Sequence, residues 1–282
     1  MKIYYGSPAY MLSVLTPIAV AFLTYLLLRG KSRKTQKYTL LSVMLLNVFQ
    51  HLFKAVIYPH HFGEGFSIVS TAYNMCALLI IISPIAFLCF RSFFLDFVLL
   101  MGSAAGLAAI LIPYWHIGGT PFSWEYLRYM ICHVLLFTTS VLPIALGHHR
   151  PSYRSIPFFG IAFLSSIIII IFNYAVCYLV GIFRIDGVST FYEAMRVANP
   201  VWAFGPPENF TSLLKASAHF SPDRWVYGGF GGGPVPILWY SIPVYLVITA
   251  FAIPVCIFAD KKRFSEDLNR YLVSTKNQKR AE

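Results

Sequence analysis

Charged side chains are scarce in this sequence of 282 residues, where Asp, Glu, Lys and Arg together account for 12% of the chain. A soluble domain carries about twice that fraction. Apolar residues make up 57% of the chain and aromatic residues 17%. This composition excludes a soluble enzyme, a disordered chain and a fibrous repeat protein. It favours a polytopic membrane protein whose apolar surface faces lipid.

Several chemical signatures are also missing. The chain has no P-loop, no GxGxxG nucleotide-binding sequence and no GxSxG nucleophile sequence. Its 5 cysteines, an odd number, all fall in apolar runs, which argues against a complete disulfide framework. His60, His61 and Glu64 lie close together but match no zinc-binding spacing. We therefore expect no metal and no cofactor.

Long apolar runs are what the sequence has instead. Seven of them are long enough to cross a bilayer about 30 Å thick, and each should be helical because a lone helix satisfies its own backbone in lipid. The predicted fold class is therefore all-α, a polytopic membrane bundle of about seven transmembrane helices in a single domain over residues 1–260. We expect the spans at residues 10–28, 38–58, 68–90, 94–113, 126–146, 157–181 and 236–259.

The placement of basic residues predicts the orientation of these spans. Lys and Arg number 15 in the tail and in the connections after the first, third and fifth spans, against 5 in the remaining connections. Cytoplasmic connections carry such an excess, so the N-terminus should face out and the C-terminus in, with residues 261–282 as a basic cytoplasmic tail. Because the net charge of +11 is mostly a topology signal, we expect no nucleic-acid partner.

The connection between the last two spans, at about residues 182–235, is far longer than a typical connector. Residues 190–197 and 212–219 could form short interfacial helices within it. With the predicted orientation this loop faces outside. It would lie on the lipid headgroups or form a lid over a site in the outer leaflet, and it is the expected docking surface for a membrane-protein partner.

The second span is the richest in polar residues. Asn47 shares one helical face with Gln50, His51 and Lys54, because these follow it by three, four and seven residues. A polar residue in a span is costly and is therefore a candidate functional group. These side chains either make packing hydrogen bonds beneath a Lys54 that extends to the outer interface, or form one wall of a site.

Cys76 and His133 lie about eight and seven residues from the outer ends of the third and fifth spans. At about 1.5 Å per residue, both are roughly 10–12 Å below the membrane boundary, the depth also expected for His51. A neighbouring imidazole can take the proton of a thiol and so create a nucleophile. Cys76 and His133 could form such a pair, and Cys76 could instead be a small packing residue.

Four segments resemble the YwaF-like integral membrane protein family. Thr71-Ala-Tyr-Asn-Met-Cys76, which opens the third span, is similar to the Leu-Pro-Leu-His-Leu-Cys of that family. His133, within Met130-Ile-Cys-His-Val-Leu-Leu136, is similar to the histidine of its fifth span. Asn199-Pro-Val-Trp-Ala-Phe-Gly-Pro-Pro207 with Ser212-Leu-Leu214, and Gly233-Pro-Val-Pro-Ile-Leu-Trp-Tyr240, resemble its later motifs. The resemblance extends from about the second span to the seventh.

This bacterial family has eukaryotic relatives that include a membrane acyltransferase acting on ether phospholipids. More distant relatives are the androgen-induced-gene-like hydrolases of fatty-acid esters. The resemblance implies a multi-pass protein of the bacterial cytoplasmic membrane that acts on a membrane lipid, as an acyl transferase or an ester hydrolase. Cys76 would be its nucleophile and His133 its base.

The remaining candidate residues are expected to line the cavity or to bind substrate: Asn47, His51, Lys54, Asn74, Asn173 and Asn199. Asn74, His51 or Asn173 could bind the developing oxyanion. The alternative is a protein without catalytic activity, such as a transporter, a lipid-handling subunit or a scaffold that binds a partner through its outer loop.

Overall fold

The computed structural model describes residues 2–57, 67–90, 93–113, 116–206, 211–229 and 232–281. Within these ranges the regular elements are α-helices and short 3-10 helices, without a strand. The predicted all-α fold is therefore confirmed for this part of the chain. His60, His61 and Glu64, considered above for metal binding, lie outside the described residues.

Among the described residues, 6 helical segments are long and apolar enough to cross a membrane. All of them coincide with predicted spans, although their ends are shifted. They are α1 (Pro8–Leu28), η1 with α5 (Ile68–Ser70 and Met75–Cys89), α6 (Phe93–Leu111), α7 (Trp124–Ala145), η3 with α8 (Tyr153–Phe158 and Phe159–Leu179) and α12 (Ser241–Ala259).

The other predicted span, the second along the chain, is a helix but is too polar to count with these six. α2 (Arg33–Leu52) packs against α5 and α7, and the short α3 (Lys54–Ile57) follows it. Asn47 and His51 of α2 are each 2% exposed, whereas Leu46 is 57% exposed. The polar face of α2 is therefore turned into protein and its apolar face outward, which lowers the cost of polar groups in a membrane.

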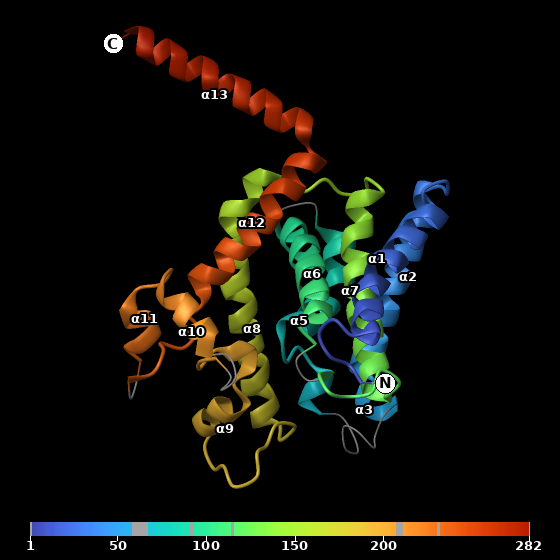
Figure 1. The fold of residues 1–282 in the computed structure, drawn as a ribbon, viewed down its shortest axis with the longest axis vertical. Coiled ribbons are helices and arrows are strands. Elements are labelled where there is room, and N and C mark those ends of the chain that lie inside the picture. Colours follow the sequence, from blue (N-terminus) through green and yellow to red (C-terminus); the bar gives the residue numbers. More distant parts are fainter. Residues whose placement is uncertain are drawn as a thin grey trace.

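The helices form two groups that meet along α5, α6 and α8 (Figure 1). In the first group, α7 contacts α1, α2 and α6, and α5 contacts α2 and α6. In the second group, α12 packs on α8 and η3. The N-terminus and α9 lie at one end of the bundle, called the α9 end here, and the C-terminal helix α13 leaves from the opposite end, the α13 end (Figure 1).

The helices α6 and α7 pack closely, and two glycines of α6 allow this approach. A Cβ atom on Gly106 would lie 2.9 Å from the backbone nitrogen of Phe137 and 3.1 Å from the carbonyl oxygen of His133. On Gly102 a Cβ atom would lie 2.3 Å from Oγ of Ser140. Small residues let backbones approach in this way in membrane bundles. The backbone that carries His133 is thereby packed directly on α6.

The long connection after α8 is folded and anchored. It contains α9 (Phe191–Ala198), η4 (Pro200–Trp202), α10 (Thr211–Ala218) and α11 (Asp223–Tyr227), so helices form close to both predicted positions. Trp239, just before α12, is 0% exposed, and its indole donates a hydrogen bond to the carbonyl of Trp202 (2.8 Å). These contacts tie η4 to the start of α12.

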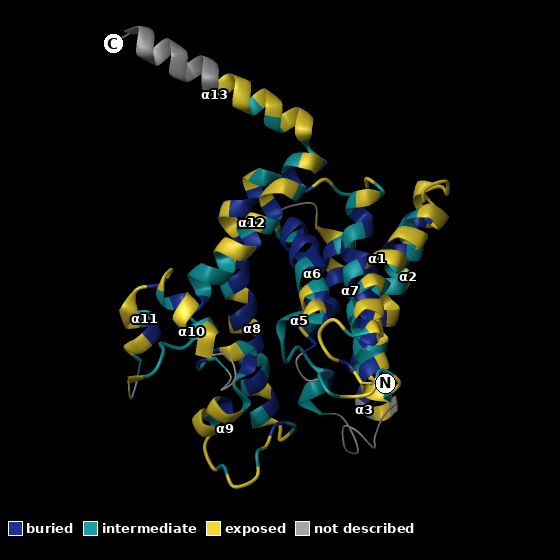
Figure 2. Cartoon of the chain, in the orientation of Figure 1, coloured by how far each residue is buried: buried dark blue, intermediate teal, exposed yellow. Residues whose placement is uncertain are grey.

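Burial differs between the central and the outer helices of the bundle (Figure 2). The central α6 is largely buried along its length, while α1 and α12 carry many exposed residues (Figure 2). The exposed residues of α1 and α12 include large apolar side chains. Phe22 of α1 is 59% exposed and Phe258 of α12 is 83% exposed. Exposed apolar surface of this kind fits helices that face lipid in a multi-pass membrane protein. The predicted basic tail forms a helix, α13 (Lys261–Ala281), which projects away from the bundle (Figure 1).

Candidate functional site

The first turn of α5 carries Cys76. Asn74 is the N-cap of this helix, and its side-chain oxygen accepts a hydrogen bond from the backbone N–H of Ala77 (2.8 Å). Asparagine is favoured at this position because it satisfies an amide that has no partner within the helix. Asn74, predicted to bind substrate, therefore fixes the start of the helix that positions the Cys76 thiol. Cys76 is a free, half-buried cysteine.

His133 lies in α7 with a defined hydrogen bond. Its Nδ1 is 2.8 Å from the carbonyl oxygen of Tyr129, one turn earlier, and the two rings are 4.3 Å apart between centroids. A carbonyl oxygen can only accept, so Nδ1 is the protonated nitrogen of this contact. In a neutral imidazole the other nitrogen, Nε2, then carries the lone pair. The fold thus presents His133 in the tautomer whose Nε2 can act as a base.

An aromatic series continues from His133 toward the connection between α6 and α7. The ring of Tyr129 is 4.6 Å from that of His116, and His116 in turn lies 5.3 Å from the ring of Tyr126. Burial lowers the pKa of His116, while the nearby Glu125 opposes this shift. His116 is therefore held in its neutral form at neutral pH.

The polar face of α2 meets α7 and the segment before α5. Asn47 donates through Nδ2 to the carbonyl of Cys132 (3.1 Å), and Gln50 donates to the side-chain oxygen of Asn47 (3.2 Å). His51 donates from Nε2 to the carbonyl of Thr71 (2.9 Å), which leaves Nδ1 as its lone-pair nitrogen when the ring is neutral. Two of the predicted site residues therefore hold α2 against the two segments that carry His133 and Cys76.

Lys54 is buried inside the protein and does not extend to the surface. Lys54 is 1% exposed, and its Nζ lies 4.6 Å from the centre of the Tyr73 ring. The ring of Tyr73 is also parallel to that of His51, with centroids 6.3 Å apart. Arg128 of α7 is close enough to Lys54 for an electrostatic interaction. Basic side chains and aromatic faces therefore lie next to each other at the α9 end of the bundle.

Thr71 joins α2 to α8 at the same end of the bundle. Its carbonyl accepts from His51, and its hydroxyl accepts from Nδ2 of Asn173 on α8 (2.8 Å) while donating to the carbonyl of Ile68 (2.6 Å). Asn173 therefore lies in this network by way of Thr71. The bonds hold the segment that enters α5 between two long helices.

Cys76 and His133 make no hydrogen bond with each other within the described part of the chain. Tyr129 is their common neighbour, because its ring contacts the ring of His133 at a tilt of 48° and lies near enough to Cys76 for an electrostatic interaction. Cys76 also interacts with Cys132, and His133 with His51. The two predicted catalytic residues therefore belong to one neighbourhood but are not a preformed hydrogen-bonded pair.

Asn199, predicted to line the cavity or bind substrate, lies at the end of α9 in the long connection. It ends α9 in the left-handed conformation (φ 41°), its Nδ2 donates to the carbonyl of Gly205 (2.9 Å), and its Oδ1 accepts from the N–H of Phe204 (2.9 Å). Asparagine tolerates this conformation better than most residues. These contacts hold the turn of η4 together, and all of them lie within the long connection.

The chain matches one known protein family. The TMEM164 family matches residues 4–231, from the start of α1 to the end of the long connection. The chain belongs to the TMEM164 family. No curated protein and no solved structure matches it. Membership identifies a membrane protein family, in agreement with the six apolar helices.

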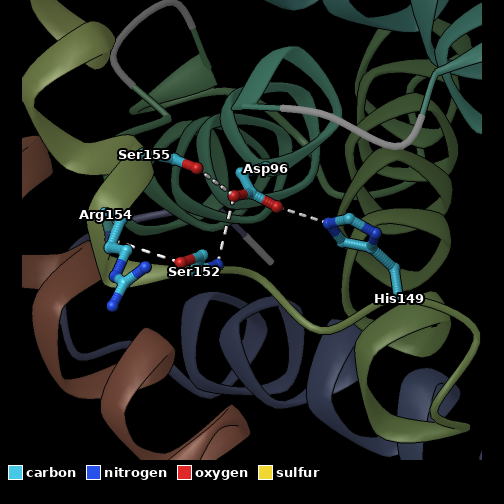
Figure 3. Close-up of polar contacts among 5 residues, drawn as sticks. All are labelled: Asp96, His149, Ser152, Arg154 and Ser155. Carbon is cyan, nitrogen blue, oxygen red and sulfur yellow. Dashed lines mark hydrogen bonds and ion pairs between the residues drawn. The ribbon is translucent and has the colours of Figure 1, made fainter. Parts of the chain in front are cut away.

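A second polar cluster lies at the α13 end of this TMEM164-family protein, and the sequence analysis missed it. Asp96, in the first turn of α6, is 3% exposed. One carboxylate oxygen pairs with Nε2 of His149, and the other accepts from the backbone N–H of Ser152 (3.1 Å) and the hydroxyl of Ser155 (Figure 3). Both oxygens are thus used to tie the connection between α7 and α8 to α6.

One residue of this cluster could have been recognised from the sequence. Asp96 is a carboxylate inside a predicted span, and such residues normally have a partner or a function. Its partner cannot be read from spacing, because His149 is 53 residues away along the chain. Arg154, next to the cluster, donates to the hydroxyl of Ser152 through its backbone N–H (3.3 Å) and bonds through its side chain to Asp267 of α13 (Figure 3 shows the first contact).

Proposed function

We propose that this protein is an integral membrane lipid-acyl transferase or lipid-ester hydrolase in which Cys76 is the nucleophile and His133 the base. One observation carries the proposal: α5, α7 and α3 contribute the Cys76 thiol, a His133 ring whose Nε2 holds the lone pair, and the side chains of Lys54 and Arg128 to one region at the α9 end. Buried ionisable groups in a membrane bundle are functional candidates by default. The resemblance to the YwaF-like family and its acyltransferase relatives supports the same assignment.

The chemistry would proceed in two acyl transfers. His133 Nε2 takes the thiol proton, the sulfur attacks the ester carbonyl of a lipid, and the carbonyl electron pair moves onto oxygen. When that pair returns, the bond to the lipid alcohol breaks, and the alcohol oxygen takes the proton from His133. A Cys76 acyl-thioester remains. A second alcohol or water, deprotonated by His133, then attacks the thioester, and the thiol regains the proton as the carbon–sulfur bond breaks.

Other residues of the cluster would stabilise the negative charge that develops during the reaction or would position the reacting groups. A thiolate in the first turn of α5 faces the positive end of the helix dipole, which favours an anion. Lys54 would stabilise negative charge near the reacting ester, whereas His51, whose N–H is used on the Thr71 carbonyl, would be a positioning residue. Asn47 and Asn173 would act as positioning residues, since they hold α2 and the segment before α5 in place. Asn74 would position Cys76 through the helix cap.

The orientation predicted from basic residues would put this site in the outer half of the membrane, with α13 in the cytoplasm. A lipid of the outer leaflet of the bacterial cytoplasmic membrane could then reach Cys76 laterally. Membrane lipid would be the substrate, and the long connection would be available for a membrane-protein partner.

The deciding experiment looks for acyl transfer to Cys76. Full-length protein is placed in nanodiscs of phosphatidylcholine with isotope-labelled acyl chains, together with a lysophospholipid acceptor. Mass spectrometry then follows the acyl adduct on Cys76 and the lipid products, and neutral hydroxylamine identifies a thioester. Cys76→Ala should lower activity by at least about a thousandfold, because loss of a covalent nucleophile has effects of that size or larger.

Cys132→Ala is the matched control, since Cys132 is a neighbouring free thiol that is buried on α7. It should keep most of the activity and the Cys76 adduct. Cys76→Ser should retain a trace at most, because a hydroxyl is a weaker nucleophile at its own pKa. If Cys76→Ala remodels phospholipid as fast as the unmodified protein, a transporter, lipid-handling subunit or scaffold becomes the better description.

A further inference from the structure

The C-terminal helix α13 begins where the last span ends. α12 finishes at Ala259, and after Asp260 the chain continues as α13 over 21 residues. Figure 1 shows α13 leaving the bundle at an angle to α12, beyond the ends of α6 and α7. Because α12 is long and apolar enough to cross a membrane, the first turns of α13 lie at the level of a membrane surface.

One face of α13 is apolar and only partly covered. Phe264, Leu268 and Tyr271 follow one another at four- and three-residue spacings, which places them on a single helical face. Phe264 packs edge-on against Tyr153 of η3, with ring centroids 5.5 Å apart. Farther along, Leu268 is 45% exposed and Tyr271 is 68% exposed. The bundle therefore covers the start of this face and leaves its continuation exposed.

The rest of α13 is strongly basic. Lys261, Lys262, Arg263 and Arg270 are all exposed. Residues 261–281 contain 7 Lys and Arg against 2 acidic residues. One of these acids, Asp267, is held by the guanidinium of Arg154 and the hydroxyl of Tyr153, which lower its pKa, so its charge is already compensated within the protein. The uncompensated charge of the helix is positive.

These features together specify a ligand surface. A helix with an apolar face and a basic face binds in the plane of a membrane interface, and its affinity rises with the content of anionic lipid. The ion pair of Asp267 with Arg154 and the packing of Phe264 on Tyr153 fix where α13 leaves the bundle, so the exposed Leu268 and Tyr271 remain near the end of the last span.

We propose that α13 is an interfacial helix that binds the anionic headgroups of the membrane in which the bundle is embedded. Leu268 and Tyr271 enter the boundary between headgroups and acyl chains, and Lys261, Lys262, Arg263 and Arg270 contact the phosphates. This inference is independent of the proposed acyl-transfer activity, because α13 lies at the opposite end of the bundle from Cys76.

The test uses full-length protein in nanodiscs of two compositions, phosphatidylcholine alone and phosphatidylcholine with one third phosphatidylglycerol. Hydrogen exchange of the α13 backbone amides is followed by mass spectrometry. Anionic lipid should slow exchange in α13 by roughly tenfold at low salt, and high salt should remove most of this protection because it screens the charges. Amides of α6 serve as an internal reference that should not change.

Two variants identify the contacts. The quadruple variant Lys261→Gln, Lys262→Gln, Arg263→Gln, Arg270→Gln should exchange equally fast in both bilayers, and Leu268→Ser with Tyr271→Ser should lose most of the protection. Ser265→Ala with Asn269→Gln is the matched control on exposed polar positions, and it should behave like the unmodified protein. Equal exchange of the unmodified α13 in both bilayers, or protection that survives the quadruple variant, overturns the proposal.

Discussion

The two ends of the bundle each hold a buried polar cluster, and the clusters differ in how completely they are bonded. At the α13 end, both carboxylate oxygens of Asp96 are engaged, by His149, by the backbone of Ser152 and by the hydroxyl of Ser155. At the α9 end, His51 and His133 each use one ring nitrogen on a backbone carbonyl. The other nitrogen of each ring makes no hydrogen bond within the described part of the chain, and the thiol of Cys76 is free of a disulfide.

The comparison separates two uses of costly buried groups. A carboxylate with both oxygens bonded stabilises the connection that it holds, and most of its acceptor capacity is used within the protein. A histidine fixed through one nitrogen is oriented for chemistry at the other. The Asp96 cluster is therefore expected to matter for stability, and the α9-end cluster for activity.

The largest expected effect is an all-or-none difference in accessibility between the two ends. We predict that Ser265→Cys in α13 reacts with a membrane-impermeant maleimide only after the cells are permeabilised, because basic residues favour the cytoplasmic side. Ser189→Cys, an exposed position in the connection at the α9 end, should react in intact cells. Labelling of position 265 from outside, with position 189 silent, would reverse the proposed orientation.

The next largest effect is expected from removal of the predicted base, His133. His133→Ala should lower acyl transfer by about 10²- to 10⁴-fold, the usual contribution of a general base, with little change in the unfolding midpoint in detergent. Tyr129→Phe is the matched control, since it keeps the backbone carbonyl that orients Nδ1 of His133. It should retain activity within a few-fold, as measured by the same lipid mass spectrometry. Comparable losses in both variants would assign the effect to packing instead.

Asp96→Ala should show the opposite pattern. It leaves His149, the N–H of Ser152 and the hydroxyl of Ser155 without their shared acceptor, so we expect the free energy of unfolding to fall by about 3 kcal/mol. Denaturant unfolding in mixed micelles would measure this loss. Ser103→Ala on the same helix removes only a bond to the carbonyl of Leu100 and should cost about 1 kcal/mol or less. A stable Asp96→Ala protein without activity would contradict the division drawn above.

The smallest expected effect is a pH dependence at the α13 end. His148 donates through Nε2 to Oε1 of Gln36 (3.0 Å), and burial together with Arg33 and Lys37 lowers its pKa. A histidine whose folded pKa lies below its ordinary value of 6.5 is stabilising above that value, and the contribution is lost as pH falls from 6.5 through the lowered pKa. We expect the unfolding temperature to fall by roughly one or two degrees over that range.

His148→Gln should remove this part of the pH dependence while keeping a side chain that can bond to Gln36. A dependence that persists unchanged in His148→Gln would come from another group and would contradict this assignment. The measurement is the unfolding temperature in detergent at a series of pH values, compared between the two proteins.

Composition and periodicity were sufficient for the fold class and for most helix positions. Hydrophobic runs predicted the six apolar helices, since a membrane requires about 20 apolar residues in a helix whatever its neighbours are. The same reasoning counted residues 38–58 as a span with one polar face, and left open whether that face packs or forms a site. Only packing reveals that α2 turns Asn47 and His51 into the protein, and that Lys54 lies against Tyr73.

For the site, too, the local sequence predicted some features and long-range contacts decided others. Depth along each helix predicted that Cys76, His133 and His51 belong to one region, because the rise per residue is fixed by helix geometry. The tautomer of His133, the pairing of His51 with Thr71 and the use of Asn74 and Asn199 as caps depend on backbone positions that no spacing encodes.

The sequence by itself determined that this chain is a helical membrane protein and which polar residues are candidates, because both follow from the cost of exposing polar groups to lipid. Only the tertiary structure decided which of those residues meet. Asp96 and His149 are 53 residues apart, and Asn173 reaches Thr71 across 102 residues. Such contacts depend on the angles at which helices cross, which side-chain packing over the whole bundle sets.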